Sequence, residues 1–151
     1  MTNDERNDRE AIRVLMARYN INGDRGDIRG LAETFAENGV IHFNNESSAG
    51  RAAILERLTG SGERHPALTV SRHHLGTSLV EIDGDTATGR TYFHVQTDIG
   101  PDHHGVYVDR FTKIGGEWKI ARREVRIDWQ SPHSLNRPQW VRGKPPAERG
   151  A

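Results

Sequence analysis

Two adjacent histidines, His73 and His74, stand at the start of an apolar, strand-like segment that reads "HHLGTSLVEI". Imidazole is the side chain best suited to take or give a proton near neutral pH, because its unperturbed pKa is about 6.5. Neighbouring side chains of a strand point to opposite faces of the sheet. One of the two rings is therefore expected to face a cavity. His73 shares its strand face with Leu75 and Leu79, so we expect it to be the structural or supporting residue and His74 to face the cavity.

A second histidine pair lies in the segment "PDHHG", which contains Asp102, His103 and His104. Adjacent histidines of one strand rarely bind a single metal ion, and no partner follows at ligand spacing. We therefore expect a loop that is solvated or borders a cavity, with no metal site and no cofactor. His94 lies among aromatic residues of a long strand-like segment and is a candidate second polar group of the cavity.

Apolar periodicity predicts three helices in the first part of the chain. The first covers residues 7–24, with Asn7 and Glu10 as a capping box. Glycines in "NGDRGD" predict a bend after it, and Asp27 is expected to cap a second short helix. A strand at "NGVIHF" and a third short helix over residues 47–62 follow. The apolar residues that we expect these first two helices to bury are Ile12, Leu15, Met16, Tyr19, Leu31, Ala32 and Phe35.

Strand patterns dominate the rest of the chain. The expected strands are residues 74–82, 86–99, 105–114 and 117–129, the last two joined by a Gly-Gly hairpin turn. Asp109 is expected to pair with an arginine of the neighbouring strand. From Ser131 the chain is rich in Pro, Gly and charge, which predicts an extended or partly disordered arm over residues 131–151, anchored by Trp140. We therefore expect one domain over residues 1–130, of the α+β class: a cone-shaped, curved antiparallel sheet with N-terminal helices that enclose a small-molecule pocket.

These segments resemble the SnoaL-like branch of the nuclear-transport-factor-2-like (NTF2-like) superfamily. The resemblance covers roughly residues 8–130 and rests on "EAIRVLMARYNINGDRGDIRGLAETFAENGVIHF", "GRAAILERL", "RHHLGTSLVEIDGDTATGRTYFHV" and the hairpin "GGEWKIARR". The superfamily contains dehydratases, dehydrochlorinases, ketosteroid isomerases, epoxide hydrolases, polyketide cyclases and non-catalytic binders. The fold alone therefore does not choose an activity.

The resemblance to scytalone dehydratase, hexachlorocyclohexane dehydrochlorinase and bile-acid 7α-dehydratase implies a set of site residues. Their aspartate after the first helix matches Asp24, and their histidine at the start of a strand matches His74 in "HLGT". Bile-acid 7α-dehydratase adds a tyrosine five positions before the aspartate, which matches Tyr19, and an arginine of the last strand, which matches Arg123, with Arg122 one step away. An unbroken helix would separate Tyr19 from Asp24, so the chain must bend near Gly23 for all four to meet.

These four residue types could eliminate water or a hydrogen halide beside an acidic C–H bond. Asp24 would orient His74 as the base, Tyr19 would assist the leaving group, and Arg123 would stabilise negative charge. The alternatives are a core tyrosine at position 19, a turn aspartate at position 24 and a structural histidine at position 74. We expect a cofactor-independent lyase of the dehydratase type acting on a hydrophobic, ring-containing hydroxy-carbonyl compound. A ketosteroid-type isomerase, a polyketide cyclase and a non-catalytic binding or interaction domain stay open.

Composition limits the partners. The chain has 151 residues, 21 basic and 21 acidic, and this balance disfavours a nucleic-acid or anionic-membrane binder. Cysteine is absent, which excludes disulfides and zinc–thiolate sites. The polar start "MTNDERNDRE" and the lack of a long apolar run predict a soluble, cytoplasmic protein. A homodimer or homotrimer is expected, because sheets of this fold commonly bury their outer face against another subunit.

Overall fold

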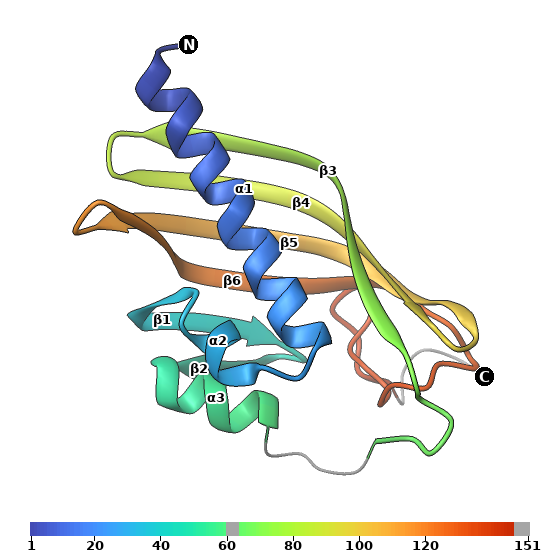
Figure 1. Cartoon of the computed structure of the whole chain (residues 1–151). Helices are drawn as coiled ribbons and strands as arrows, with labels where there is room; N and C mark the ends of the chain where they lie inside the picture. The colour runs from blue at the N-terminus through green and yellow to red at the C-terminus, as the bar shows by residue number, and fades with distance from the viewer. Residues whose placement is uncertain (60–63, 147–151) are drawn as a thin grey trace.

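The computed structural model describes residues 1–59 and 64–146. Within them, a sheet curls around the first helix, α1 (Figure 1). The strand order is β2-β1-β6-β5-β4-β3, and every neighbouring pair is antiparallel except β1 with β6, which are parallel. The expected α+β cone is confirmed, with a mixed sheet in place of a wholly antiparallel one. The elements are α1 (Asn3–Asp24), α2 (Ile28–Ala32), β1 (Phe35–Phe43), β2 (Glu46–Ala49), α3 (Arg51–Thr59), β3 (Ser71–Asp83), β4 (Thr86–Thr97), β5 (Gly100–Ile114) and β6 (Glu117–Gln130).

Helix α1 begins earlier than the sequence pattern predicts. Thr2 caps it: the Thr2 hydroxyl accepts from the Glu5 backbone N–H at 3.1 Å, and Glu5 accepts from the Thr2 backbone N–H at 2.8 Å. This capping box replaces the one expected five residues later, at Asn7 and Glu10. The helix also continues through Gly23 to Asp24, so the expected bend falls only after the site aspartate, where Gly26 has a φ of 81°.

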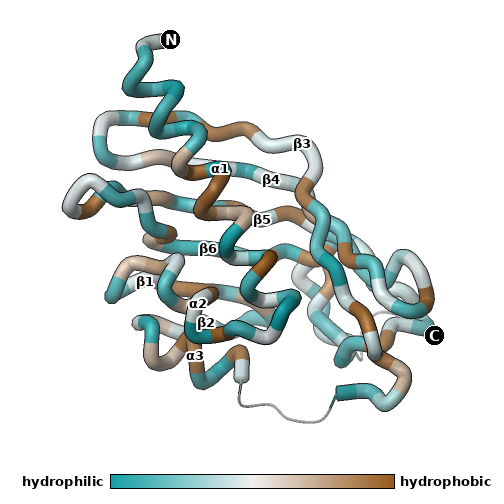
Figure 2. Tube along the Cα trace, viewed as in Figure 1, coloured by the Kyte–Doolittle hydropathy of each residue, from teal (hydrophilic) through white to brown (hydrophobic). Residues whose placement is uncertain are grey.

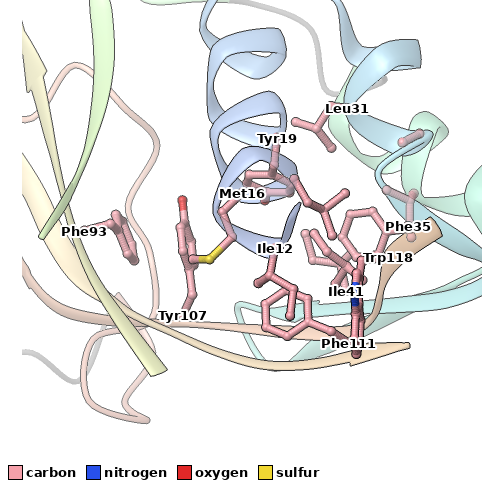
Figure 3. Packing of buried hydrophobic residues seen from close by; sticks show 14 of the residues in the cluster. Ile12, Met16, Tyr19, Leu31, Phe35, Ile41, Phe93, Tyr107, Phe111 and Trp118 are labelled. Atoms are coloured by element: carbon pink, nitrogen blue, oxygen red, sulfur yellow. The ribbon is translucent and has the colours of Figure 1, made fainter. Parts of the chain in front are cut away.

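The apolar stripe of α1 packs on the concave face of the sheet. Ile12, Met16 and Tyr19 meet aromatic side chains from β1, β5 and β6 (Figure 3). Hydrophobic segments appear among hydrophilic ones along α1, as an amphipathic helix requires (Figure 2). No helix among the described residues is long and apolar enough to cross a membrane.

Three local predictions were wrong and two were right. Residues 47–49 belong to strand β2, and the described part of the expected third helix is Arg51–Thr59; residues 60–62 lie outside the described residues. Phe35 begins β1 instead of ending a helix. The segment "GPDHHG" is the first part of β5, not a loop. Asp27 does cap α2 by accepting from the Gly30 backbone N–H at 2.9 Å, and the Gly-Gly turn joins β5 to β6 with both glycines at positive φ.

The segment after β6 folds back over the ends of three strands. The Ser131 N–H donates to the Asp102 carbonyl of β5 at 2.8 Å, and the Arg142 N–H donates to the Ile127 carbonyl of β6 at 2.9 Å. The Trp140 N–H donates to the Asn44 side chain, just after β1, at 2.9 Å. We call residues 131–146 the C-terminal arm.

Candidate active site

The last residue of α1 bonds a histidine of β3. Asp24 Oδ1 lies 2.6 Å from His73 Nδ1, and Asp24 Oδ2 accepts from the His73 backbone N–H at 3.0 Å. The Asp24 side chain is 8 % exposed and the His73 side chain 29 % exposed. Burial alone would raise the pKa of Asp24, but the bonds from the His73 ring and backbone outweigh it and lower that pKa. The carboxylate is thus held ionised against the ring.

The expected pairing of Asp24 with His74 is therefore wrong. In the β3–β4 register, His73 lies opposite the buried Val95, whereas His74 lies opposite His94. The rings of His74 and His94 stack at 5.0 Å between centroids on the exposed outer face. The alternation of a strand puts only one of two adjacent rings inside, and the inner one is His73. His94, the expected second polar group of the cavity, lies outside with His74.

A second histidine–carboxylate pair comes from "PDHHG". His103 Nδ1 lies 2.6 Å from Asp102 Oδ1, and both residues are buried. Shifts in register next to Gln96 and Gly105 accompany this start of β5, where two neighbouring side chains are buried. The expected solvated loop is therefore wrong at these residues. Among the described residues, no cluster of three or more His, Cys, Asp or Glu side chains could hold a metal ion.

The two inner imidazoles and the Phe93 ring lie at the corners of a triangle, so each ring is close to the other two. The imidazole centroids are 6.5 Å apart, and each is 6.3–6.4 Å from the Phe93 ring. Because each Nδ1 is bound to a carboxylate, each Nε2 is the nitrogen left to meet a ligand. Burial lowers the pKa of His103, and this outweighs the opposing effect of Asp102. His103 is therefore neutral at neutral pH.

Deeper in the cone, Arg123 of β6 pairs with Asp109 of β5. The guanidinium makes two bonds to the carboxylate, at 2.8 and 2.9 Å, and neither side chain is exposed. The pairing expected for Asp109 is confirmed, and Arg123 rather than Arg122 faces inward. The guanidinium lies over the rings of Tyr19 and Tyr107, 4.2 and 3.9 Å from their centroids. Attraction to Asp109 raises the pKa of Arg123 although burial opposes it.

Tyr107 connects the deep pair with the histidines. Its ring stacks on Phe93 at 4.3 Å, and its hydroxyl accepts from Asn20 Nδ2 at 3.1 Å. Within the described part of the chain, Asn20 Oδ1 and Arg123 Nη1 are buried without a hydrogen-bond partner. A buried donor and a buried acceptor of this kind favour a ligand or water that supplies the missing bonds. Tyr107 and Asn20 were missed from the sequence, although the strand face shared by Tyr107 and Asp109 was a usable signal.

The four residues predicted as one set are therefore divided. Asp24 lies with His73 near the surface, and Tyr19 lies with Arg123 in the interior. Tyr19 and Asp24 are five residues apart on an unbroken helix, which places them about 140° apart around its axis. His74 is on the opposite face of the sheet. The inner face joins Asp24 and His73 to Arg123 through Phe93 and Tyr107.

A groove of about 710 Å³ lies between the C-terminal arm and the end of β6. Ser134 and Asn136, which also bond Asp102, form part of its wall. A molecule in this groove would touch the residues that hold the second pair.

Comparison with known proteins identifies the fold family. A SnoaL-like domain matches residues 4–124. The chain belongs to the SnoaL-like domain family. An NTF2-like protein with a cystatin-like fold from Novosphingobium aromaticivorans is 32 % identical, with 85 % of this chain and 86 % of that chain covered and a TM-score of 0.73. Comparison with curated proteins finds no significant match.

Two further structures share the fold at lower identity. A candidate scytalone dehydratase from Novosphingobium aromaticivorans is 23 % identical, with both chains fully covered and a TM-score of 0.79. A hexachlorocyclohexane dehydrochlorinase from Novosphingobium barchaimii is 16 % identical, with 89 % of this chain and 98 % of that chain covered and a TM-score of 0.73. The SnoaL-like family expected from the sequence is confirmed by the match over residues 4–124, and these two structures share the fold of this chain.

Proposed function

We propose that this SnoaL-like protein is a cofactor-independent lyase that removes water from a hydrophobic, ring-containing hydroxy-carbonyl compound. The observation that carries the proposal is the bond between Asp24 and the half-buried ring of His73, on the inner face of the cone. A carboxylate on Nδ1 holds the neutral ring with its proton on that nitrogen and stabilises the imidazolium that forms. Nε2 then carries the lone pair that takes a proton from the carbon next to the carbonyl.

The elimination needs one proton taken and one given. His73 Nε2 accepts the proton of the C–H bond, and the electrons of that bond move into the enolate. When the enolate collapses, a carbon–carbon double bond forms and the carbon–oxygen bond to the leaving hydroxyl breaks. The imidazolium returns its proton to that oxygen, which leaves as water. His73 ends neutral, as it began.

The interior supplies the apolar wall and the positive charge. Phe93 stacks on Tyr107, and Tyr19 meets Tyr107 edge to face; we assign these rings to the apolar wall beside the substrate. Arg123 Nη1 is a buried donor without a partner among the described residues, and we assign it to the enolate oxygen. Tyr19 is then a positioning residue, because its ring lies against the guanidinium.

The test compares two neighbouring histidines. A panel of β-hydroxy ketones is incubated with wild type, His73→Ala and His74→Ala, and water loss is followed by mass spectrometry. The proposal expects water loss in wild type and in His74→Ala, and its loss in His73→Ala. Exchange of substrate hydrogen with deuterated solvent without water loss would favour an isomerase. Binding without either reaction would favour a non-catalytic binder.

We further infer that a second copy of the chain covers the outer face of the sheet. Leu79 is 64 % and Tyr92 56 % exposed, beside the exposed rings of His74, His94 and Trp129. Such apolar side chains on an open sheet face are typical of an interface. Sedimentation of wild type and Tyr92→Glu tests this inference and separates dimer from trimer. A wild-type monomer at all concentrations would contradict it.

A further inference from the structure

We propose that His103 recognises the leaving hydroxyl of the substrate as a hydrogen-bond acceptor, and that the C-terminal arm holds it in that state through Asp102. This rests on the proposed function only in taking the ligand to be a hydroxy-carbonyl compound. The inference adds a substrate preference: a leaving group that can donate a hydrogen bond is selected over one that cannot.

The first step is the orientation of the His103 ring. Its Nδ1 lies 2.6 Å from Asp102 Oδ1, and an ionised carboxylate only accepts hydrogen bonds. In the neutral ring the single proton is therefore on Nδ1, and Nε2 has a lone pair. The ring shares the inner face with His73 at 6.5 Å. A hydroxyl between the rings can donate to His103 and receive its new proton from His73.

The second step is how Asp102 is fixed. Five groups donate to its carboxylate: His103 Nδ1, Thr97 Oγ1, Ser134 Oγ, the Leu135 backbone N–H and Asn136 Nδ2. Three of these donors come from the arm, at 2.6, 2.9 and 3.0 Å. A carboxylate offers about four lone-pair sites, so these donors saturate it. Neither the carboxylate nor the ring that it holds can turn while the arm is in place.

The third step is the charge around the ring. Asp102 and His104 flank His103 on β5, and His73 with its partner Asp24 face it from β3 and α1. The Ser134 and Asn136 side chains that reach Asp102 from the arm are uncharged. Burial would raise the pKa of Asp102, but the bonds from Ser134, His103, Leu135 and Asn136 lower it to about 2. Burial lowers the pKa of His103, although Asp102 opposes this. We expect the arm donors to weaken that opposing effect, because they share the negative charge of Asp102.

The test begins without a substrate. Full-length protein labelled with ¹⁵N-histidine is titrated by two-bond ¹H–¹⁵N NMR. At neutral pH, His103 is expected to be neutral with its proton on Nδ1. In the double variant Ser134→Ala/Asn136→Ala its pKa should rise, because fewer donors share the charge of Asp102. His133→Gln, an exposed change in the arm, is the matched control and should leave it unchanged. A proton on Nε2 in wild type, or an unchanged pKa in the double variant, would overturn the proposal.

Binding then tests the preference. A β-hydroxy cyclohexanone and its methyl ether are compared, because the ether has nearly the same shape but cannot donate. Wild type should bind the hydroxy compound about 3- to 10-fold more tightly, the scale of one net hydrogen bond. His103→Phe should remove the difference. Equal binding of both compounds by wild type overturns the inference whether or not turnover occurs. A preference without water loss would instead overturn only the proposed lyase activity.

Discussion

Replacing Asp102 with asparagine should destabilise the protein in a pH-dependent way. The carboxylate is buried and accepts five hydrogen bonds. An asparagine has one acceptor oxygen, and its NH₂ group would face groups that are themselves donors. The substitution therefore removes the negative charge of Asp102 and replaces one of its two acceptor oxygens by a donor.

The size of the charge contribution follows from the pKa of Asp102, which is lowered from 3.8 to about 2. One pKa unit corresponds to about 1.4 kcal/mol. Because Ser134 and Asn136 lie towards solvent, screening reduces the effect. The ionised Asp102 therefore contributes at most about 2 kcal/mol to the free energy of unfolding. A lowered pKa means that this stability is fully present above the unfolded-state pKa of about 4. It is lost as the pH falls towards about 2, because the unfolded state takes up the proton first.

Urea denaturation at pH about 5 and about 3 measures this effect. The gap in unfolding free energy between wild type and Asp102→Asn should be larger at the higher pH and should narrow at the lower one. Asp128→Asn, a change on the neighbouring strand away from the described ion pairs, is the matched control. A gap of the same size at both pH values would refute the reasoning, because it would mean that the loss is due to shape and not to charge.

Three further results are expected. His73→Ala should lower turnover of a hydroxy ketone by about 10²–10⁴-fold and His74→Ala should not; equal losses at unchanged melting temperature would contradict the assignment. Asp24→Asn should lower turnover by about 10²-fold or more with unchanged affinity for an apolar ligand, and full activity in steady-state kinetics would leave it a structural residue. Asp109→Asn should cost about 3–5 kcal/mol in urea denaturation because it leaves Arg123 charged and buried, whereas Asp109→Leu with Arg123→Met should cost less.

The architecture was predictable because its signals are local. The apolar stripe of α1, the capping residue Asp27 and the Gly-Gly turn each act within a few residues of chain. The start of α1 was misplaced because Asn7 with Glu10 and Thr2 with Glu5 both fit a capping box, and sequence alone does not choose between them. Residues 47–49 were assigned to a helix because β2 is short, and its pairing with β1 depends on a partner strand.

The site was predictable only in the contact between the end of the first helix and the start of a strand. Asp24 was expected to bond a histidine at the start of a strand, and it does. The choice between His73 and His74 depends on which face of β3 turns inward. That face is fixed by the pairing of His73 with Val95, and beyond it a shift in register separates Leu75 from Ser78. A one-residue difference in register exchanges the two faces. The motif "HLGT" locates strand β3 in the sequence but does not show which of its side chains point to the inner face of the sheet.

The second pair was hidden for a different reason. Pro, Asp and Gly in "GPDHHG" are typical of loops, and an aspartate inside a buried strand segment is costly unless its charge is satisfied. The donors that satisfy Asp102 come mainly from Ser134, Leu135 and Asn136, more than thirty residues later. The matched SnoaL-like region ends at residue 124, so these donors lie outside it. Each inner imidazole thus depends on a segment beyond the sheet: His73 on the end of α1 and His103, through Asp102, on the arm. The shared fold provides the face on which both rings lie, and the two flanking segments fix which nitrogen of each ring is presented.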